Sequence, residues 1–564
     1  MCAKTTISLL LSLMALLAHG ASFSRVSNGL KAEVWKADRS TERVLSGNGV
    51  FGPVMYVFLS ERVDSAAAAV WAETLGLETI ASEFAGQYCF VNPIGERYGD
   101  ADVAEFREVL KAFGPATNAK VIAIGEGATF VNQRLAADPI IGAVASVVSI
   151  DGAPGSRVAA PVPAFVVGKK AKAVAKPYIL ANDARLADGG EGLSHRFCPD
   201  EPLRQVFFGA RGNASYGEVI TQAWDRLMSR NYRYNNMHHT QYTVPGADVE
   251  KYGNSELIPY MIPAHYGVER HMVEHEVTVF GKAAGKYLWY EYIPEFFASA
   301  PKASVPLMVL LHGNTNDPRT QAETSGFVEI AQKEQFFVAE LEWQGTTKGY
   351  MAMGLDGIEH TIRLLLKKYP QLDPSRIYAE GLSAGSMTAS ALGVQKSHLF
   401  AAVGGHSGGI YPGLVAYYDG ESLMAEATQK RGAVEMPYCS VCGTADKVVK
   451  YPQPDDWEET SFFHAWKVYQ TMNDLPVADK LDFAVDAFFG MNLSDRERLS
   501  TPQGIGMETG VIYKGEVPII KLVAVDGYGH WNFKPTAQVM WNYFSQFSRD
   551  PATKTLHYNS KPSK

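Results

Sequence analysis

Cysteine is scarce in this chain, with five residues in 564, and no further Cys or His pair accompanies the C-x-x-C of Cys439 and Cys442. That pair lies in "MPYCSVCGTAD", which is typical of a buried strand running into a turn. In a strand, residues three apart point to opposite faces, so we expect two core thiols rather than a zinc or redox site. Cys2 belongs to the N-terminal segment discussed next. A disulfide between Cys89 and Cys198 remains open for an exported protein.

Runs of basic residues and long apolar runs are also lacking. Fifty-two Lys and Arg stand against 60 Asp and Glu, a net charge of −8 without basic clusters, so nucleic acid is not expected as a partner. The apolar run from Ile7 to Leu17 follows Lys4 and is shorter than the roughly 20 residues of a membrane helix. Small residues follow at 18 and 20, the two positions that a signal peptidase reads. We expect a signal peptide over 1–20, cut near Ala21, and a soluble, exported protein without a membrane span.

Apolar runs and amphipathic segments alternate along the second half of the chain. The runs "VPLMVLLHG", "FFVAELEW", "RIYAEG", "FAAVGGHSG" and "MPYCSVCG" are separated by segments with helical periodicity such as "GIEHTIRLLLKKY". Uninterrupted apolar strands that alternate with helices indicate a mostly parallel sheet covered on both faces. The pattern predicts an α/β fold.

The first half repeats this order, from "GPVMYVFLS" through "KVIAIGEGATF" to "VPAFVVGKK". A duplication explains the repeat, although any two α/β domains share such a rhythm. We expect a domain over 21–227, a linker or extension over 228–266 and a second domain over 267–564. Residues that correspond under this alignment are Pro53 and Pro306, Gly125 and Gly381, Gly168 and Gly443, and Trp224 and Trp541.

One glycine-rich turn in the second half carries a candidate nucleophile. Gly381-Leu382-Ser383-Ala384-Gly385 follows the strand "RIYAE" and precedes a helix-like segment. A G-x-S-x-G match is meaningful in this strand–turn–helix context, because the crowded turn requires glycine at both ends and lifts the serine hydroxyl clear of the sheet. The pattern predicts Ser383 as a nucleophile.

A serine nucleophile needs a base and an acid that orients the base, and these follow it in chain order in this type of fold. Asp446 in "VCGTADKVV" and His530 in "VDGYGHWNF" both come directly after apolar strands. After the first strand, "LLHGNTND" offers the backbone N–H of Asn314, which with that of Ala384 would form an oxyanion hole. We interpret His312 in this loop as structural.

These motifs resemble those of a known enzyme group. "LHGNTND", "GLSAGS", "CGTADKVV" and "GYGHWNF", with "FAAVGGHSG" after the turn, are similar to the polyhydroxybutyrate depolymerase and feruloyl esterase group of α/β-hydrolases, over about residues 273–547. The resemblance implies a secreted, cofactor-free and metal-free esterase in which Ser383, Asp446 and His530 form the triad. Asn314 and Ser386 stand where Cys and Gly are usual in many depolymerases, which puts the polymer substrate in doubt.

Other polar residues near these motifs are weaker candidates. Ser386 lies one helical turn after Ser383 and could be the nucleophile in its place. His406 follows a strand and could line the pocket, but it precedes the acid in the chain. Asp526 could substitute for Asp446. Two further carboxylates, at 455 and 456, are interpreted as solvated loop charges.

The first half lacks this chemistry. Under the alignment above, Gly127 takes the place of the serine, Ala171 that of the acid and Asn213 that of the histidine. We therefore expect a degenerate hydrolase-like domain that supports the second domain or forms a wall of its cleft. A long insertion over 448–518 is predicted to form a pocket roof, or else core, with its aromatic residues Trp457, Phe462, Phe463, Trp466 and Tyr469.

The sequence thus predicts a serine ester hydrolase acting on a polyhydroxyalkanoate, feruloyl or related ester. A peptidase of the prolyl-oligopeptidase type is the alternative, although the repeated short strands of a propeller are absent. A non-catalytic binding protein is a third possibility. The acyl and alcohol specificity and the oligomeric state are not encoded in any motif that we recognise.

Overall fold

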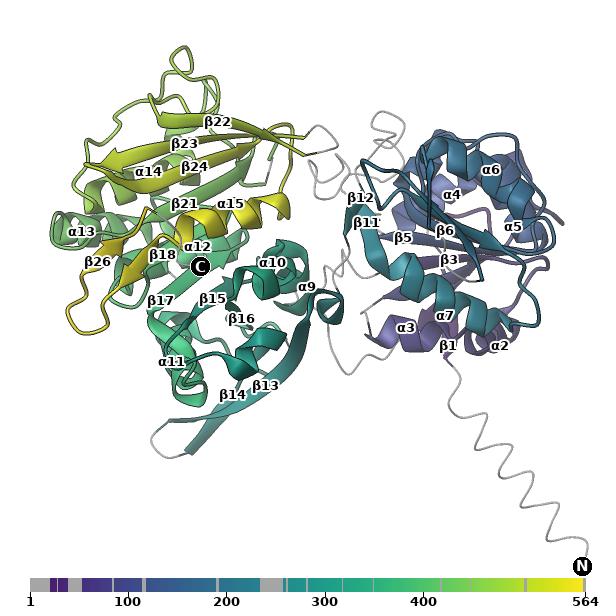
Figure 1. Cartoon of the computed structure of the whole chain (residues 1–564), viewed down its shortest axis with the longest axis horizontal. Helices are drawn as coiled ribbons and strands as arrows, with labels where there is room; N and C mark the ends of the chain where they lie inside the picture. Colours follow the sequence, from purple (N-terminus) through teal and green to yellow (C-terminus); the bar gives the residue numbers. More distant parts are fainter. Residues whose placement is uncertain are drawn as a thin grey trace, which may run out of the picture. The chain divides into compact units, whose positions relative to one another are not determined.

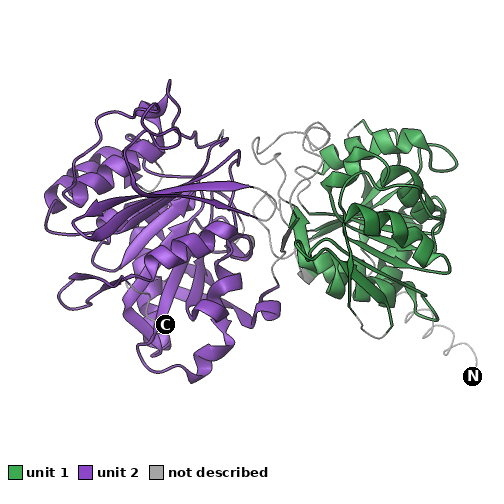
Figure 2. Ribbon diagram, turned by 45° about the horizontal axis from the view of Figure 1, so that its top comes forward, with its two compact units in different colours: residues 1–42, 50–235, 242–259 green, residues 43–49, 236–241, 260–564 purple. Residues whose placement is uncertain are grey.

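The computed structural model describes residues 21–38, 53–233, 257–259 and 262–560, apart from short gaps at 28, 84–85, 114–117, 189–191, 280–281, 317, 348, 416–417, 447 and 502–504. The predicted signal peptide over 1–20 and most of the predicted linker over 228–266 lie outside the described residues. The chain divides into two compact units (Figure 2), one formed by described residues up to 259 and one by described residues from 262 onward. No described helix combines the length and the apolarity that a bilayer span requires.

Unit 1 is built on a ten-stranded sheet with helices on both sides (Figure 1). Its central six strands are parallel and its edges are antiparallel. The strand order is β1 (Ser22–Arg25), β2 (Val34–Asp38), β4 (Gln87–Val91), β3 (Val54–Phe58), β5 (Ala119–Ile124), β6 (Val144–Ile150), β7 (Ala164–Val167), β10 (Gln205–Gly209), β9 (Ser194–Phe197) and β8 (Leu186–Asp188). Its helices are α2 (Ser65–Leu75), α3 (Leu77–Glu83), α4 (Asp100–Ala112), α5 (Glu126–Phe130), α6 (Ala171–Ala181) and α7 (Tyr216–Arg226).

Unit 2 contains a second ten-stranded sheet with the same arrangement. Again six central strands are parallel and the outer strands are antiparallel. The order is β13 (Val268–Val279), β14 (Lys282–Pro294), β16 (Phe337–Leu341), β15 (Val305–Leu311), β17 (Leu372–Gly381), β18 (Ala402–His406), β21 (Tyr438–Gly443), β24 (Val517–Val525), β23 (Gly506–Lys514) and β22 (Ser494–Ser500). The helices are α9 (Pro318–Ser325), α10 (Phe327–Glu334), α11 (Gly354–Lys368), α12 (Ala384–Gln395), α13 (Gly420–Lys430), α14 (Ser461–Met472) and α15 (Pro535–Phe544).

The two sheets match strand for strand, which confirms the predicted fold class of two α/β-hydrolase-like units with mostly parallel sheets. Side-chain contacts are repeated as well. Asn182 at the end of α6 donates to the carbonyls of Val162 and Tyr178, at 2.7 and 2.8 Å. Asn473 at the end of α14 donates to the carbonyls of Met436 and Tyr469, at 2.9 and 2.8 Å. Helix α14 and strands β22–β24 therefore belong to the fold that the two units share. The interpretation of residues 448–518 as an insertion is wrong for these elements.

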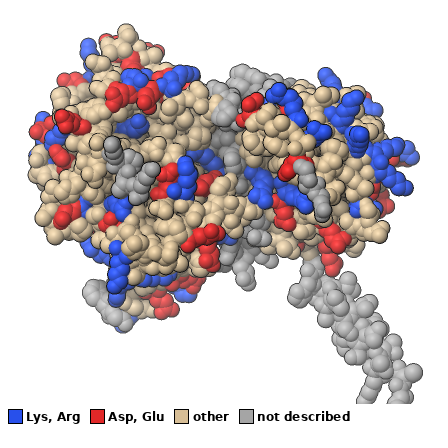
Figure 3. Space-filling view, in the orientation of Figure 1, with Lys and Arg blue, Asp and Glu red and all other residues tan. Residues whose placement is uncertain are grey.

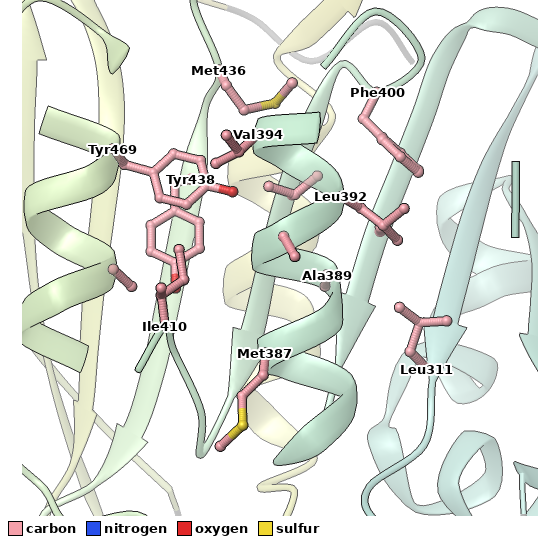
Figure 4. Close-up of a cluster of buried hydrophobic side chains, with 14 of the residues drawn as sticks. Leu311, Met387, Ala389, Leu392, Val394, Phe400, Ile410, Met436, Tyr438 and Tyr469 are labelled. Carbon is pink, nitrogen blue, oxygen red and sulfur yellow. The ribbon is translucent and has the colours of Figure 1, made fainter. Parts of the chain in front are cut away.

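The core of unit 2 surrounds α12, which is buried on nearly all sides. Figure 4 shows Met387, Leu392 and Val394 of this helix among side chains from neighbouring elements. Tyr438 of β21 stacks on Tyr469 of α14, with ring centroids 3.9 Å apart. Because α12 begins directly after Ser383, this packing fixes the start of the helix relative to the sheet.

The cysteines follow one prediction and contradict another. Cys439 and Cys442 are both fully buried on β21, as expected of core thiols, and burial raises the pKa of Cys439 to about 12. Cys89 and Cys198 are both free and buried. The disulfide considered for them is wrong: Cys89 lies on β4, whereas Cys198 directly follows β9, and five strands separate these two in the sheet.

Charged side chains of both signs are interspersed on the face of unit 2 drawn in Figure 3, without a wide area of either sign. Among the described residues there is also no cluster of three or more His, Cys, Asp or Glu side chains that could hold a metal ion.

Candidate active site

The residues singled out from the sequence follow three strands of the same parallel sheet. Ser383 comes after β17, Asp446 after β21 and His530 after β24. Strands β17, β18, β21 and β24 are successive parallel neighbours, so their carboxyl ends lie at one edge of the sheet. Residues that are far apart in the sequence therefore emerge at the same edge.

Ser383 occupies a strained turn between β17 and α12. Its backbone has φ 54° and ψ −117°, a conformation that non-glycine residues rarely adopt. The N–H of Ser383 donates to the carbonyl of His406 at 2.9 Å. Although Ser383 stands at the N-cap of α12, its side chain does not cap the helix. The hydroxyl is half-buried and is left available for other contacts.

The two glycines of this turn are required by close approach of the backbone. A Cβ on Gly385 would lie 1.9 Å from the carbonyl oxygen of Leu311 on β15. A Cβ on Gly381 would lie 2.3 Å from the carbonyl carbon of Gly385. Both neighbours are backbone atoms that cannot move aside, so any other residue would push α12 away from the sheet.

Asp446 and His530 form a buried pair. The Nδ1 of His530 lies 2.8 Å from Oδ2 of Asp446, and the two residues are 3% and 5% exposed. The other carboxylate oxygen of Asp446 accepts the N–H groups of Val448 and Val449, at 2.9 and 3.0 Å. With Asp446 as acceptor, Nδ1 of His530 carries the proton and Nε2 has a free lone pair. A histidine in this state can accept a proton from a hydroxyl.

The serine is not yet in contact with this pair. Among the described residues the Ser383 hydroxyl makes no hydrogen bond, so the structure joins Asp446 to His530 and places Ser383 at the same sheet edge without a serine–histidine bond. In enzymes without substrate such contacts are often long and close only in the complex. His406 lies between the two segments, with its carbonyl on Ser383 and its ring near His530.

The loop after β15 approaches the serine. A Cβ on Gly313 would lie 3.5 Å from Cβ of Ser383, so this glycine lets the backbone pass beside the nucleophile. Asn314 follows, exposed, with its Oδ1 accepting Nε2 of Gln344 at 3.1 Å. Ala384 is the first residue of α12, where a helix leaves N–H groups without intrahelical partners. The loop and the helix start are thus placed where two N–H donors could face a common oxygen.

His312 stabilises the loop after β15 from the protein interior. It is fully buried, its Nε2 lies 3.3 Å from Oε1 of Glu342, and its carbonyl accepts Nε1 of Trp343 at 2.9 Å. Burial opposes the ionisation of Glu342, but contacts with His312, Thr347 and Thr346 outweigh it and lower the pKa of the carboxyl. These contacts fit the structural role expected for His312. Glu342 was not identified from the sequence, since no motif marks it.

The residues considered as alternatives to Ser383 and Asp446 are either buried away from substrate or exposed to solvent. Ser386 is fully buried inside α12, where a Cβ on Gly405 would lie 2.0 Å from its hydroxyl, so no substrate can reach it. The side chain of Asp526 is 47% exposed and lies 3.5 Å from Arg498. Asp456 is exposed and lies 3.4 Å from Lys450, as expected of a solvated loop charge.

The counterpart of this turn in unit 1 is built on a different residue than the sequence alignment indicated. Gly125 is the N-cap of α5 with φ 60° and ψ −116°, and its N–H donates to the carbonyl of Ile150 at 2.8 Å. These values match Ser383 and its bond to His406. A Cβ on Gly127 would meet the carbonyl of Phe58 on β3, just as one on Gly385 meets Leu311. The structural counterpart of Ser383 is therefore Gly125, and Gly127 corresponds to Gly385.

The turn in unit 1 is also closed. A Cβ on Gly125 would lie 2.1 Å from Oγ of Ser60. The same Oγ accepts the N–H of Glu126, the first residue of α5, at 3.1 Å. After β7, helix α6 begins at Ala171 and leaves no loop like the one that carries Asp446. Unit 1 thus lacks both the hydroxyl and the open N–H group found in unit 2.

The aromatic residues predicted as a pocket roof are mainly core. Phe462, Phe463, Trp466 and Tyr469 on α14 are all buried, and only Trp457 is partly exposed. The roof interpretation is wrong for these four residues of α14, because all of them belong to the hydrophobic core of unit 2.

A cavity of about 290 Å³ lies instead between α13, α14 and the segment after β18. Its wall is mostly apolar, and the polar side chains in it are those of Lys467, His464 and Glu421. Gly408, two residues before the wall residue Ile410, would place a Cβ 2.6 Å from the carbonyl oxygen of Ser383. The cavity wall therefore begins two residues along the chain from a glycine that contacts the backbone of Ser383. It is lined by Ile410, Pro412, Gly420, Glu421, Met424, His464, Lys467 and Val468.

Comparisons with known proteins point to the group expected from the motifs. No family model matches the chain. Over 149 residues it is 27% identical to poly(3-hydroxyalkanoate) depolymerase C of Paucimonas lemoignei, which covers 24% of this chain and 34% of that protein. The chain thus spans about a third of the length of this relative.

Solved structures similar to the chain include an acetyl xylan esterase from Aspergillus awamori, with 16% identity over 48% of this chain and 98% of that one, at a TM-score of 0.32. An S-formylglutathione hydrolase from Agrobacterium tumefaciens gives 11% identity over 50% of this chain and 95% of that one, at 0.34. The depolymerase relative confirms the predicted resemblance to the depolymerase and feruloyl esterase group of α/β-hydrolases.

Proposed function

We propose that this protein is a serine hydrolase that cleaves carboxylic esters through an acyl-enzyme intermediate. The observation that carries the proposal is the buried Asp446–His530 hydrogen bond at the same sheet edge as Ser383, whose hydroxyl stands uncapped in a strained turn. The carboxylate that holds Nδ1 of His530 is itself fixed by two backbone N–H groups, an arrangement that keeps a catalytic imidazole in one tautomer.

In the first step, Nε2 of His530 takes the proton of Ser383 as the serine oxygen attacks the ester carbonyl. Asp446 keeps the imidazole in the required tautomer and stabilises the imidazolium that forms. The carbonyl oxygen becomes an oxyanion, which the N–H groups of Asn314 and Ala384 stabilise by a few kcal/mol. His530 then protonates the leaving alcohol, and an ester of Ser383 remains.

In the second step, water replaces the alcohol. His530 accepts a proton from the water as it attacks the acyl carbonyl, and the same oxyanion donors act again. Collapse of this second intermediate returns the proton to the Ser383 oxygen and releases a carboxylic acid. The chain's own residues supply every proton transfer in the cycle.

The substrate that we propose is an ester of a hydroxyalkanoate, of a feruloyl-type acid or of a related acid. The relative from Paucimonas lemoignei is named for its action on poly(3-hydroxyalkanoate). The apolar cavity beside Gly408 has room for one acyl group of moderate size, and Lys467 and His464 at its rim suit a polar end group.

The proposal is tested with a fluorophosphonate probe, which labels activated serines. Wild-type protein takes up the label and hydrolyses p-nitrophenyl esters, whereas Ser383→Ala does neither. Ser386→Ala is the matched control and keeps both activities, since this hydroxyl is buried in the helix. Unlabelled wild-type protein contradicts the proposal, and turnover of peptide amides without ester turnover indicates the peptidase alternative.

The role of the cavity is tested separately with Met424→Trp, which fills it. We expect kcat/KM for p-nitrophenyl hexanoate to fall by at least about tenfold while that for the acetate changes by less than about threefold, because only the longer chain needs the space. Equal effects on both esters contradict an acyl-binding role.

We also propose that the protein is exported and that residues 1–20 are removed. The support is the short apolar run after Lys4, followed by small residues. N-terminal sequencing of protein recovered from outside the cytoplasm is expected to begin near Ala21, and a mature protein that retains Met1 contradicts the proposal.

A further inference from the structure

His406 is the last residue of β18, which lies between the strands that precede Ser383 and Asp446. It is 1% exposed. Its carbonyl accepts the N–H of Ser383 at 2.9 Å, and a backbone bridge joins it to Leu382. The residue thus holds the nucleophile turn through its main chain, independently of its side chain.

The imidazole of His406 points toward the other half of the site. Its Nε2 accepts the backbone N–H of Phe533 at 3.3 Å, and Phe533 is three residues after His530. Since Nε2 acts as acceptor, Nδ1 carries the ring proton and donates it to Oγ of Ser407 at 2.9 Å. Both ring nitrogens therefore have defined partners, and the tautomer is fixed.

The ring remains neutral in this position. Burial and the nearby His530 lower the pKa of His406 to about 3. A neutral neighbour does not repel the positive charge that develops on His530 during the reaction, whereas a protonated one would. Protonation of Nε2 would also break the bond to the N–H of Phe533.

Unit 1 offers a natural comparison within the same chain. There the carbonyl of Ile150 accepts the N–H of Gly125 at 2.8 Å, which reproduces the backbone bond. The isoleucine side chain, however, has no acceptor for a neighbouring loop. The histidine is thus found in the unit that contains the serine, aspartate and histidine, and it is absent from the unit that lacks them.

We propose that His406 is a positioning residue whose ring holds the loop carrying His530 in register with the turn carrying Ser383. This inference rests on the proposed serine-hydrolase function. The backbone of His406 fixes one partner and its Nε2 fixes the other, so a single residue sets their separation. No motif assigns it this role, because it lies between the nucleophile and the acid in the sequence.

The experiment compares three substitutions in the full-length protein. His406→Gln places an amide oxygen near the position of Nε2 and can still accept the N–H of Phe533. His406→Asn reaches only the position of Nδ1, and His406→Ile copies unit 1. We expect Asn and Ile to lower kcat for a p-nitrophenyl ester by about 10- to 100-fold with little change in KM, and Gln to stay within about threefold of wild type.

Thermal unfolding and amide exchange distinguish a positioning role of His406 from a purely structural one. Positioning predicts that Asn and Gln variants unfold at similar temperatures yet differ in kcat. It also predicts faster deuterium exchange in the peptide that contains Phe533 for Asn and Ile, but not for Gln, even in a Ser383→Ala background without activity. Losses that follow unfolding temperature alone, equal kcat for all three variants, or unchanged exchange overturn the inference. If wild-type protein does not react with fluorophosphonate, the proposed serine-hydrolase function is wrong. The exchange experiment still tests the hydrogen bond between His406 and Phe533, because it does not depend on activity.

Discussion

Asp446 uses each of its carboxylate oxygens for a different purpose, and this division makes it sensitive to the smallest substitution. Asp446→Asn keeps the volume but replaces one acceptor by an NH₂ group, which favours the wrong tautomer of His530. We expect kcat to fall by about 10³- to 10⁴-fold with KM little changed. Steady-state kinetics with a p-nitrophenyl ester measures the effect. Asp526→Asn, at an exposed site beside Arg498, is the control, and its kcat stays within about twofold of wild type. A large loss of kcat in Asp526→Asn and none in Asp446→Asn would make Asp526 the acid that orients His530.

Glu380 on β17 gives a prediction for the pH dependence of stability. Burial raises its pKa to about 8, and its Oε2 has no hydrogen-bond partner among the described residues. The unfolded chain loses this proton near pH 4.5, whereas the folded protein keeps it until pH 8. Folding stability therefore falls as pH rises through this window, by at most about 1.4 kcal/mol per pH unit.

Glu380→Gln removes that dependence. We expect the variant to gain unfolding temperature relative to wild type between pH 5 and pH 8, as measured by thermal denaturation across this range. Glu218→Gln is the control, because hydrogen bonds from the backbone and side chain of Ser215 lower the pKa of Glu218. The difference in unfolding temperature between this control variant and wild type stays constant above pH 6. A Glu380→Gln difference that is also constant would contradict the buried neutral carboxyl.

At the scale of elements, the strand–turn–helix unit around Ser383 depends on close backbone contact. Gly385→Ala places a methyl group against the carbonyl of Leu311, and we expect the free energy of unfolding to fall by about 3 kcal/mol or more. Denaturant unfolding measures the change. Gly413→Ala is the matched control, since no atom lies within 4 Å of its added Cβ. Equal stability of the two variants would mean that the turn relaxes freely.

The same element shows what the sequence could and could not reveal. The turn was predictable because its glycines, its serine and the flanking strand are neighbours in the chain. The bond from His406 to Phe533 was not, since it joins residues 127 positions apart and no motif spans that distance. The sequence left the aromatic residues of α14 open between a pocket roof and core, because periodicity alone does not tell which partner a helix face contacts.

The alignment of the two halves failed for a related reason. Matching glycines by their letters set Gly127 against Ser383, whereas matching backbone contacts sets Gly125 there. Similar glycines occur at both ends of the turn, so the letters fit two registers. Only the contact with the neighbouring strand of the sheet, at Phe58 in one unit and at Leu311 in the other, decides between them.

At the scale of the whole molecule, the two units share one topology but differ in chemistry. We expect that Gly125→Ser in a Ser383→Ala background takes up no fluorophosphonate. The new side chain meets Oγ of Ser60, and no loop after β7 supplies an acid. Labelling followed by mass spectrometry tests this. The single Ser383→Ala variant is the baseline, and label at position 125 would show that unit 1 retains hydrolytic chemistry.

The closed turn of unit 1 has a practical consequence for ligand design. Oγ of Ser60, 3.1 Å from the nitrogen of Glu126, marks with the protein's own atoms where an oxygen sits when it satisfies the first N–H of such a helix. The corresponding nitrogen in unit 2 is that of Ala384. A boronic acid that bonds to Ser383 and projects a hydroxyl to the equivalent point would copy this contact, so unit 1 provides a template for an inhibitor of its neighbour.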